Sequence, residues 1–176
     1  MIDADHGTID SPLSPGQVDL LPGVPQALKS LSEGGYAVCI VSNQPANAKG
    51  KTTRENLERV HERVLKLAQA AGGKIDASFI CFHKSEDNCA CRKPKTGLLE
   101  AALKRYPDIT RSDIWMVGDG VPDVQAGTAL RLQTAYLGPE KSDAHRIFVE
   151  ARCLPSIWEE SLASFVNRLL KKEKIH

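Results

Sequence analysis

The sequence predicts an α/β protein in which a parallel sheet carries helices on both faces. Short apolar segments of strand length alternate with longer segments whose apolar residues recur at helical spacing. The short segments are apolar throughout, as strands buried on both faces of a parallel sheet are. Polar clusters follow them directly, and proteins with such sheets bind their ligands beyond the carboxyl ends of the strands.

The expected elements alternate between helix and strand over most of the chain. In the first half, we expect a helix from Val24 to Gly34 with Pro25 in its first turn, a strand from Tyr36 to Ser42, a helix capped by Thr52 and Glu55 and ending at Gly72, and a strand from Ile75 to His83. In the second half, we expect a helix from Leu98 to Tyr106, a strand from Asp113 to Asp119, a helix from Pro122 to Leu130, a strand from Gln133 to Gly138, a loose stretch, and a helix from Ile157 to Leu170.

The composition is that of one ordinary globular domain. The 176 residues carry a formal charge of +1, with 41% apolar and 26% charged residues, which fits a single domain over residues 1–176. A charge this small gives no electrostatic reason to bind nucleic acid. No apolar run in the sequence has the length needed to cross a bilayer. We therefore expect a cytoplasmic monomer without nucleic-acid or membrane partners.

Three of the five cysteines crowd beside a histidine after the second predicted strand. Cys81-x-His83 and Cys89-x-Cys91 offer three thiolates and one imidazole, the closed tetrahedral set that structural zinc prefers. An odd number of cysteines in a reducing compartment argues against a disulfide framework. The alternative is a surface loop whose cysteines are incidental. Four protein ligands would leave zinc no open position, so the metal would order the loop rather than catalyse.

Two cations and one strand-terminal turn offer contacts to a phosphate. Arg92 and Lys93 directly follow the last metal ligand, so the metal would fix where these cations point. A solvated basic pair is the alternative. Ser42 ends the first predicted strand, and its hydroxyl and the backbone N–H groups of the turn suit a phosphoryl oxygen. Asn43 and Gln44 stand beside it, although such turns are common.

Two carboxylates lie at the end of the third predicted strand. Asp119 follows the apolar run, and Asp123 comes four residues later. A carboxylate in this position can hold Mg²⁺, which takes one or two carboxylates plus substrate oxygens and keeps several waters. The alternative is a strand-terminal turn in which Asp123 caps the next helix.

Taken in chain order, these motifs resemble the haloacid dehalogenase-like phosphatase superfamily. The residues that carry the resemblance are VSNQ, CFH…CACRKP and MVGDGVPDV, and it extends over about residues 21–137. The sequence is similar to the branch of D-glycero-D-manno-heptose 1,7-bisphosphate phosphatases and histidinol-phosphatases, for which C-x-H…C-x-C-R-K-P is the most specific signature. The resemblance implies a three-layer α/β/α sandwich of Rossmann type, with a parallel sheet, a zinc-binding loop insertion and no large cap.

The resemblance also implies roles for residues at the matching positions. Among the catalytic residues, Ser42 would bind the transferring phosphoryl group, and Lys93 would neutralise its charge and hold the nucleophile. Asp119 would coordinate Mg²⁺, and Asp123 would support that metal site. The substrate contacts would be Ser42, Asn43, Gln44, Arg92 and Lys93, and the zinc ligands Cys81, His83, Cys89 and Cys91. Gly120 stands where family members usually have a lysine, or in some cases an arginine, so one expected cation is absent there.

In this family a carboxylate attacks phosphorus to give an aspartyl-phosphate, which splits hydrolysis into two easier steps. Mg²⁺ and Lys93 would offset the negative charge that gathers on the phosphoryl oxygens. A second aspartate two residues after the nucleophile would protonate the leaving oxygen and then activate water.

The N-terminal stretch MIDADHGTID looks like the D-x-D-G-T motif of that nucleophile with one histidine inserted. In one interpretation, Asp3 is the nucleophile and Asp5 the acid/base. In the other, the stretch matches the loop that follows the motif in the family. A central parallel strand needs about five apolar residues, and only two residues precede Asp3. We therefore expect this chain to lack the nucleophile strand.

The sequence thus predicts a Mg²⁺-dependent sugar-phosphate phosphatase with a structural zinc loop. Heptose 1,7-bisphosphate is the preferred substrate, because the loop after Gln44 that ends in AKGK is nearer to that branch. Histidinol phosphate is the alternative substrate. A third hypothesis is a catalytically inactive, zinc-stabilised α/β domain that binds phosphorylated ligands or a partner.

Overall fold

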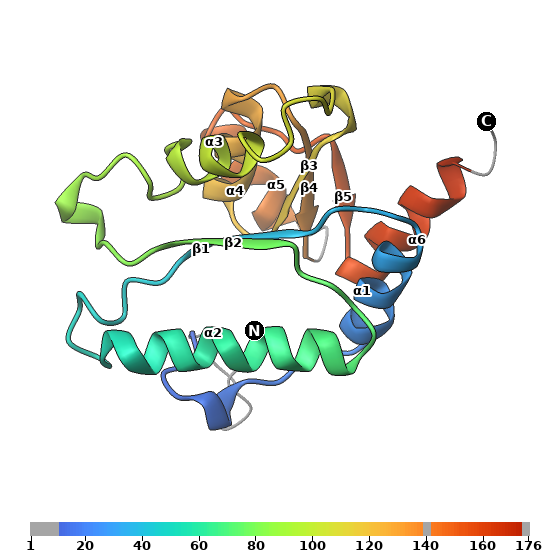
Figure 1. Ribbon diagram of the computed structural model, residues 1–176. Coiled ribbons are helices and arrows are strands. Elements are labelled where there is room, and N and C mark those ends of the chain that lie inside the picture. The colour runs from blue at the N-terminus through green and yellow to red at the C-terminus, as the bar shows by residue number, and fades with distance from the viewer. Residues whose placement is uncertain (1–10, 139–141, 174–176) are drawn as a thin grey trace. The chain divides into compact units, whose positions relative to one another are not determined.

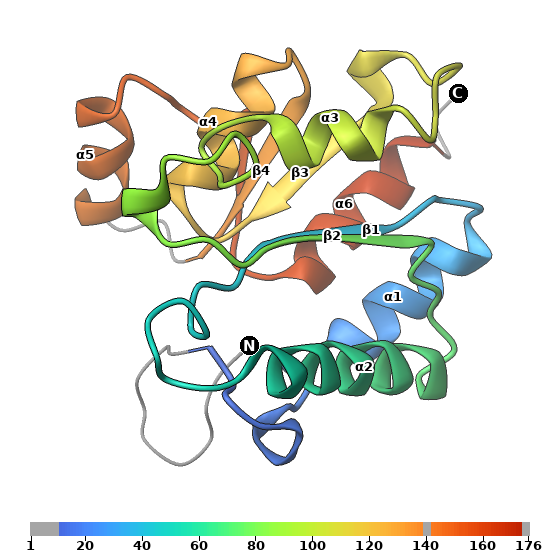
Figure 2. The ribbon, with the colours of Figure 1, turned by 60° about the vertical axis from the view of Figure 1, so that its left-hand side comes forward.

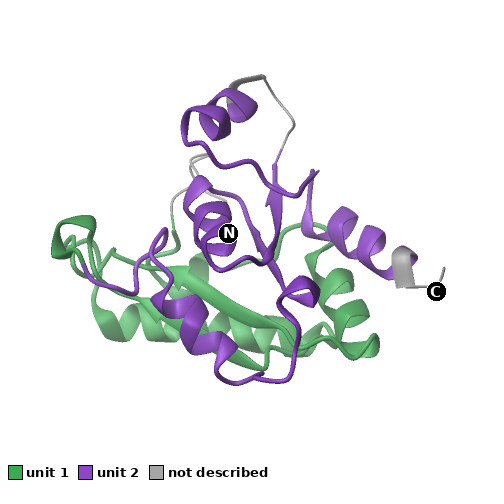
Figure 3. Cartoon of the chain, turned by 90° about the horizontal axis from the view of Figure 1, so that it is seen from above, with its two compact units in different colours: residues 1–88 green, residues 89–176 purple. Residues whose placement is uncertain are grey.

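The computed structural model describes residues 11–138 and 142–173 (Figure 1). The chain divides into two compact units, Met1–Asn88 (unit 1) and Cys89–His176 (unit 2), which Figure 3 colours separately. Each unit combines a parallel sheet with helices, so the predicted α/β class is confirmed. That residues 1–176 form a single domain stays a prediction.

Unit 1 is built around two parallel strands. Its elements are the short helix η1 (Pro15–Gln17), α1 (Val24–Glu33), β1 (Cys39–Asn43), α2 (Arg54–Ala70), β2 (Ala77–Cys81) and the short helix η2 (Ser85–Asp87). The register of the strands runs from Cys39 opposite Ala77 to Asn43 opposite Cys81. Helices α1 and α2 lie on one side of the strands (Figures 1 and 2). The register therefore places the turn after β1 next to Cys81, where β2 ends.

Helix α1 begins and ends close to the predicted positions. Gly23 precedes it with a φ of 80°, a left-handed conformation that favours glycine, and a proline occupies the first turn. Leu28 and Leu31 are buried on its inner face. A Cβ atom at Gly73 would come within 2.5 Å of the Leu28 side chain, so glycine lets the loop after α2 approach α1 closely.

The cap of helix α2 differs from the prediction by one residue. Thr53, not Thr52, is the N-cap, and its hydroxyl accepts the Asn56 backbone N–H at 3.1 Å. Thr52 instead donates its hydroxyl to the Leu13 carbonyl at 3.0 Å. The predicted capping box of Thr52 and Glu55 is therefore wrong, because a tertiary partner takes the threonine that the local pattern favoured.

Unit 2 contains three parallel strands in the order β3-β4-β5 among its described residues. Its elements are α3 (Gly97–Leu103), the short helix η3 (Arg111–Asp113), β3 (Trp115–Gly118), α4 (Val121–Ala129), β4 (Gln133–Leu137), α5 (Ser142–Glu150), β5 (Ile157–Glu159) and α6 (Leu162–Glu173). Helix α4 packs against β3 and β4 (Figure 2). A Cβ atom at Gly127 would lie 2.7 Å from Thr134 and 2.8 Å from Met116, so glycine permits this close packing.

Two elements of unit 2 were not expected from the sequence. The stretch treated as loose contains α5, and the predicted start of the last helix is instead β5, with α6 beginning at Leu162. The aromatic rings of Tyr136, Phe148 and Trp158 lie edge-to-face, with centroids 5.0 to 5.2 Å apart. Such pairs add to the stability that burial provides. Tertiary contacts, not local periodicity, therefore fix this region.

Within the described ranges, no helix has the length and apolarity that crossing a membrane requires.

Candidate functional site

Four side chains that could hold a metal ion gather at the end of β2 and in the loop after it. One ligand atom from each of Cys81, His83, Cys89 and Cys91 lies within 4.8 Å of all the others. Cys81 is only 1% exposed, the other two cysteines are half-buried, and His83 is exposed. The structure thus brings together all four predicted zinc ligands, which come from one stretch of chain.

The donor set is the one that a tetrahedral zinc ion prefers. Zinc–sulfur and zinc–nitrogen bonds of about 2.3 and 2.05 Å give tetrahedral edges of about 3.8 Å between sulfurs and 3.6 Å between sulfur and nitrogen. Cys81 Sγ and His83 Nδ1 are 3.6 Å apart, which matches the sulfur–nitrogen edge. The Cys89 and Cys91 Sγ atoms lie 3.3 Å apart, so they would have to separate by about 0.5 Å to bind zinc.

Backbone contacts hold the ends of this metal-binding segment, residues 81–91. The Gln44 N–H donates to the Cys81 carbonyl at 2.7 Å, which ties the first ligand to the turn after β1. The Gly97 N–H donates to the Ala90 carbonyl at 3.2 Å. A Cβ atom at Gly97 would lie 2.7 Å from that oxygen, so the close approach needs glycine. The guanidinium carbon of Arg54 lies 4.4 Å from the ring centroid of Phe82, within the range of cation–π attraction.

The turn after β1 orients one predicted phosphate ligand. Ser42 Oγ accepts a hydrogen bond from Gln44 Nε2 at 3.1 Å. Gln44 Oε1 is buried and has no donor among the described residues. A buried acceptor without a donor is costly, so a bound ligand that offers a hydroxyl or an N–H would satisfy it. Asn43 pairs with Cys81 in the strand register, beside the metal-binding segment.

A buried ion pair forms in unit 2 between Lys93 and Asp123. Lys93 Nζ lies 2.5 Å from Asp123 Oδ1, and each side chain is 10% exposed. The second oxygen, Asp123 Oδ2, accepts the Gly120 backbone N–H at 3.1 Å. The N-cap of α4 is Gly120, not Asp123 as the capping alternative had it; Asp123 lies in the first turn, where it braces the cap residue and binds a lysine as well. No local sequence pattern predicts this pairing, because the two residues are distant in the chain and each was expected to serve a phosphate or a metal ion.

Asp119 occupies the position expected for a magnesium ligand. It directly follows β3, and its side chain is exposed. Asp123 is buried, with one oxygen on Lys93 and the other on Gly120. A Cβ atom at Gly118 would collide with the Asp123 carboxylate, so the strand must end in glycine for the pair to form. Of the two carboxylates in this turn, Asp119 is therefore the one that is accessible to a cation from solvent.

The remaining predicted residues are placed as follows. Arg92 is half-buried between the last cysteine and Lys93. Ser42, Asn43 and Gln44 belong to unit 1, and Arg92, Lys93, Asp119 and Asp123 to unit 2. The two interpretations of MIDADHGTID, with Asp3 and Asp5, concern residues outside those that the structure describes.

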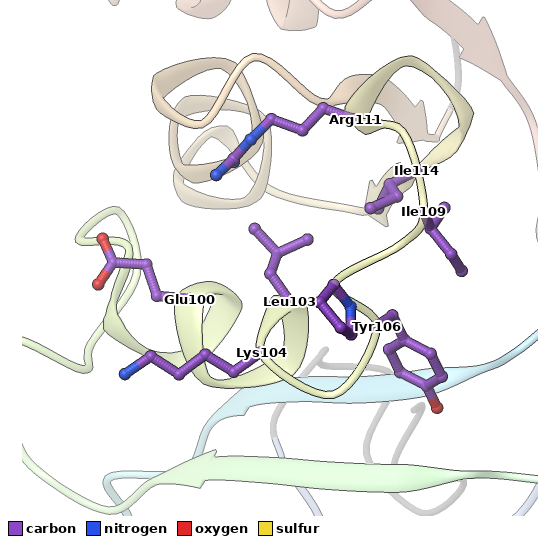
Figure 4. Close-up of a pocket in the computed structure, with 8 residues that line it drawn as sticks. Glu100, Leu103, Lys104, Tyr106, Ile109, Arg111 and Ile114 are labelled. Carbon is purple, nitrogen blue, oxygen red and sulfur yellow. The ribbon is translucent and has the colours of Figure 1, made fainter.

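A surface cavity of about 400 Å³ lies elsewhere in unit 2, at the end of α3. It includes none of the predicted site residues, and its lining mixes charged and apolar side chains (Figure 4): Glu100, Leu103, Lys104, Tyr106, Pro107, Ile109, Arg111 and Ile114. Arg111 is held there by donating to the Leu130 carbonyl at 3.0 Å. The position of the cavity therefore does not identify the site of chemistry.

Comparison with known proteins finds similarity to haloacid dehalogenase-like hydrolases and to several named phosphatases. Residues 13–131 match the family model described as haloacid dehalogenase-like hydrolase. A D-glycero-beta-D-manno-heptose-1,7-bisphosphate 7-phosphatase of Neisseria meningitidis is 36% identical over 104 residues, which cover 59% of this chain and 55% of that protein. The chain thus spans about half the length of this relative.

Two further similarities extend over more of the chain. The histidine biosynthesis bifunctional protein HisB of Actinobacillus pleuropneumoniae is 36% identical over 149 residues, covering 81% of this chain and 40% of that protein. The crystal structure of D,D-heptose 1,7-bisphosphate phosphatase from B. bronchiseptica, complexed with magnesium and phosphate, matches with a TM-score of 0.80. That match has 27% identity and covers 91% of this chain and 88% of the other.

Proposed function

Because the chain belongs to the haloacid dehalogenase-like hydrolases, we propose that it hydrolyses phosphomonoesters of small phosphorylated metabolites. Two of its relatives are named as a heptose bisphosphate phosphatase and as a bifunctional histidine-biosynthesis protein. The similar solved structure contains magnesium and phosphate. These relatives support a phosphatase, and the contacts within this chain suggest which residues serve it.

The observation that carries the proposal is the buried Lys93 ammonium held by Asp123. A lysine fixed in a low-dielectric setting stabilises negative charge on a phosphoryl group more than a solvated one does. We assign Lys93 to the phosphoryl oxygens and Asp123 to the positioning of Lys93. Ser42, oriented by Gln44, would donate its hydroxyl to a phosphoryl oxygen.

Asp119 fits the role of the Mg²⁺ ligand in this proposal. Its carboxylate is exposed at the end of β3, whereas both oxygens of Asp123 have partners within unit 2. Bound Mg²⁺ would supply electrostatic stabilisation of the transferring phosphoryl group. Arg92, beside Lys93, would contact the substrate.

The preferred substrate in this proposal is a heptose 1,7-bisphosphate. The buried Gln44 Oε1 without a described donor supports a substrate rich in hydroxyl groups, and the heptose phosphatase relative supports the sugar. Histidinol phosphate is the second candidate, because the histidine-biosynthesis relative matches 81% of the chain.

Zinc in the metal-binding segment would have a structural role and not a catalytic one. Four protein ligands close the coordination shell, and the segment leads directly into Arg92 and Lys93. We propose that zinc fixes the path of the backbone up to these cations. Metal analysis of the purified protein tests this, and a zinc content near zero would contradict it.

Phosphate release from heptose 1,7-bisphosphate and from histidinol phosphate, with and without Mg²⁺, tests the function. We expect Mg²⁺-dependent release that Lys93→Met lowers by about 100-fold or more. Lys104→Met, which changes an exposed lysine of the same unit, is the matched control and should leave the rate unchanged. Release that resists both Lys93→Met and Asp119→Asn would contradict the assigned roles.

The Asp3→Asn variant tests the first interpretation of the N-terminal stretch. Loss of turnover with retained binding of inorganic phosphate would assign the nucleophile to Asp3. Unchanged turnover would exclude Asp3. If the unaltered protein binds phosphate and releases none from either substrate, the third hypothesis, a phosphate-binding domain without catalysis, replaces the phosphatase.

A further inference from the structure

Two cysteines of the metal-binding segment, Cys89 and Cys91, lie close together. Their Sγ atoms lie 3.3 Å apart, and one residue separates them in the chain. We propose that these two cysteines form a reversible disulfide when the protein meets a hydroperoxide, and that the reaction expels the metal. The release of metal rests on the proposed zinc site, and neither part rests on phosphatase activity.

The geometry requires only a small movement. A disulfide has a sulfur–sulfur bond of about 2.05 Å, so the two Sγ atoms must approach by about 1.3 Å from their present separation. None of the five cysteines, all within the described part of the chain, forms a disulfide in this structure. The pair is therefore reduced and already close to bonding distance.

Exposure selects this pair from the cluster. Cys89 and Cys91 are half-buried residues and His83 beside them is exposed, so this side of the cluster is nearer to solvent than Cys81 is. Cys81 is 1% exposed and lies at the end of a strand. Oxidation follows thiolate character and access, and zinc ligation keeps the sulfurs as thiolates. The disulfide is therefore expected between the accessible pair and not with Cys81.

The reaction balances with one hydroperoxide. When the oxidant is hydrogen peroxide, one thiolate attacks a peroxide oxygen. A sulfur–oxygen bond forms, the oxygen–oxygen bond breaks, and hydroxide is the leaving group. The second thiolate attacks the resulting sulfenic sulfur, forming the sulfur–sulfur bond and releasing a second hydroxide. Two thiolates are oxidised and one peroxide is reduced. Zinc keeps its charge and loses two of its four ligands.

Loss of two ligands leaves Cys81 and His83, which are too few for a structural zinc site. The ion then leaves to solvent or to a chelator. Because Arg92 and Lys93 directly follow Cys91 in the chain, the oxidised segment would also alter the backbone that carries the proposed phosphate-binding cations. The pair thus makes the metal-binding segment a target of oxidative modification.

The test exposes the purified, zinc-loaded protein to hydrogen peroxide and follows two readouts. A chromogenic chelator measures the released zinc, and tryptic mass spectrometry measures the peptide of residues 85–92, which contains both cysteines and lacks Cys81. We expect that peptide to become about 2 Da lighter in proportion to zinc release. A thiol reductant with added zinc should reverse both changes.

Cys39→Ser is the matched control, since Cys39 is also half-buried but lies outside the cluster. It should leave zinc release unchanged. Zinc retained at peroxide levels that oxidise Cys39, or a disulfide that joins the peptide of residues 75–84 through Cys81, would overturn the proposal. Zinc release with peptide 85–92 at its reduced mass would overturn it as well.

Metal analysis before oxidation keeps the two proposals apart. A protein purified without zinc would contradict the zinc site, and the mass of peptide 85–92 would still decide whether the disulfide forms. Phosphatase assays take no part in the test, so loss of the proposed function would not affect its result.

Discussion

The buried pair of Lys93 and Asp123 is the contact in which structure and proposed chemistry meet. Each charged side chain is 10% exposed, and burial of either charge alone would cost several kcal/mol. Asp123 therefore holds the lysine in a place where solvent screens its charge little. A ligand that competes for the lysine would have to offer a comparable negative charge, which a phosphoryl group does.

Removal of the lysine should destabilise the protein strongly. We expect Lys93→Met to lower the free energy of unfolding by about 3 kcal/mol, because the Asp123 carboxylate remains buried without its partner. In a double-mutant cycle with Asp123→Asn, the two losses should not add. Urea unfolding measures both effects.

The exposed pair of Arg54 and Glu58 serves as the control for this cycle. Its side chains are 61% and 53% exposed, so its coupling energy should be below about 0.5 kcal/mol. Equal coupling in the buried and exposed pairs would show that the Lys93–Asp123 contact does not persist in solution.

Gly118 is the residue that lets β3 end against Asp123. A methyl group there would collide with the Asp123 carboxylate, so we expect Gly118→Ala to cost about 1–3 kcal/mol of unfolding free energy. Gly120→Ala is the comparison in the same turn, since its Cβ would lie 3.3 Å from Pro122 and 3.4 Å from Asp123. In thermal unfolding, the melting temperature of Gly118→Ala should be well below that of Gly120→Ala. Equal melting temperatures would contradict this.

At this scale the sequence predicted the four metal ligands but not the partners of Lys93. The ligands lie within one short stretch, so their spacing alone revealed the cluster. The pairing of Lys93 with Asp123 depends on how the chain folds between them, and no local pattern encodes it. The same holds for Thr52, whose hydroxyl binds Leu13 rather than a helix end.

Among the secondary-structure elements, α2 carries a half-buried histidine that links stability to pH. Burial lowers the pKa of His61 from its ordinary value of 6.5, and the neighbouring Glu62 opposes this shift. The unfolded chain therefore takes up the proton first as the pH falls. Well above pH 6.5 both states are neutral at this site, so the effect of His61 on stability vanishes there and appears as the pH falls through 6.5.

We expect acidification from pH 7.5 to about 5.5 to destabilise the protein partly through His61. His61→Gln should lose less unfolding free energy over this range than the unaltered protein. The two proteins differ only at this residue, so the difference between their urea unfolding curves isolates His61. An identical loss in the two proteins would refute the link.

The helices and strands with strong local signals were predicted well, and the two with weak signals were missed. Helix α1 and strands β1 to β4 carry apolar runs or helical spacing together with glycine or proline at their ends. Strand β5 is three residues long and forms because it pairs with β4 and places Trp158 against Tyr136. Helix α5 buries Phe148 in the same cluster. Both depend on partners that the local sequence does not reveal.

For the molecule as a whole, the metal-binding segment should contribute to global stability. Metal that binds the folded chain and not the unfolded chain stabilises the fold by mass action. We expect a zinc-selective chelator to lower the melting temperature by more than about 5 °C. His83→Ala, which removes one ligand, should melt lower and respond less to the chelator. A melting temperature that the chelator leaves unchanged would show that the segment folds without metal.

The family could be recognised from the sequence because its motifs are short and occur in a fixed chain order. VSNQ and MVGDGVPDV span the ends of β1 and β3, and CACRKP follows the loop after β2. The division of the chain into two compact units had no sequence signal, since no linker composition marks the boundary at Asn88.

The hydrogen bond from the Gln44 amide to the Cys81 carbonyl has a consequence for how the metal can be observed. The amide belongs to the turn that orients Ser42, and the carbonyl belongs to the first metal ligand. If metal loss frees Cys81, this amide loses its acceptor and exchanges its hydrogen with deuterated water faster. Amide exchange at Gln44 should therefore report metal occupancy, whereas exchange at Ala27, inside α1, should stay unchanged. The exchange rate of this one backbone amide would then report whether the metal site is occupied.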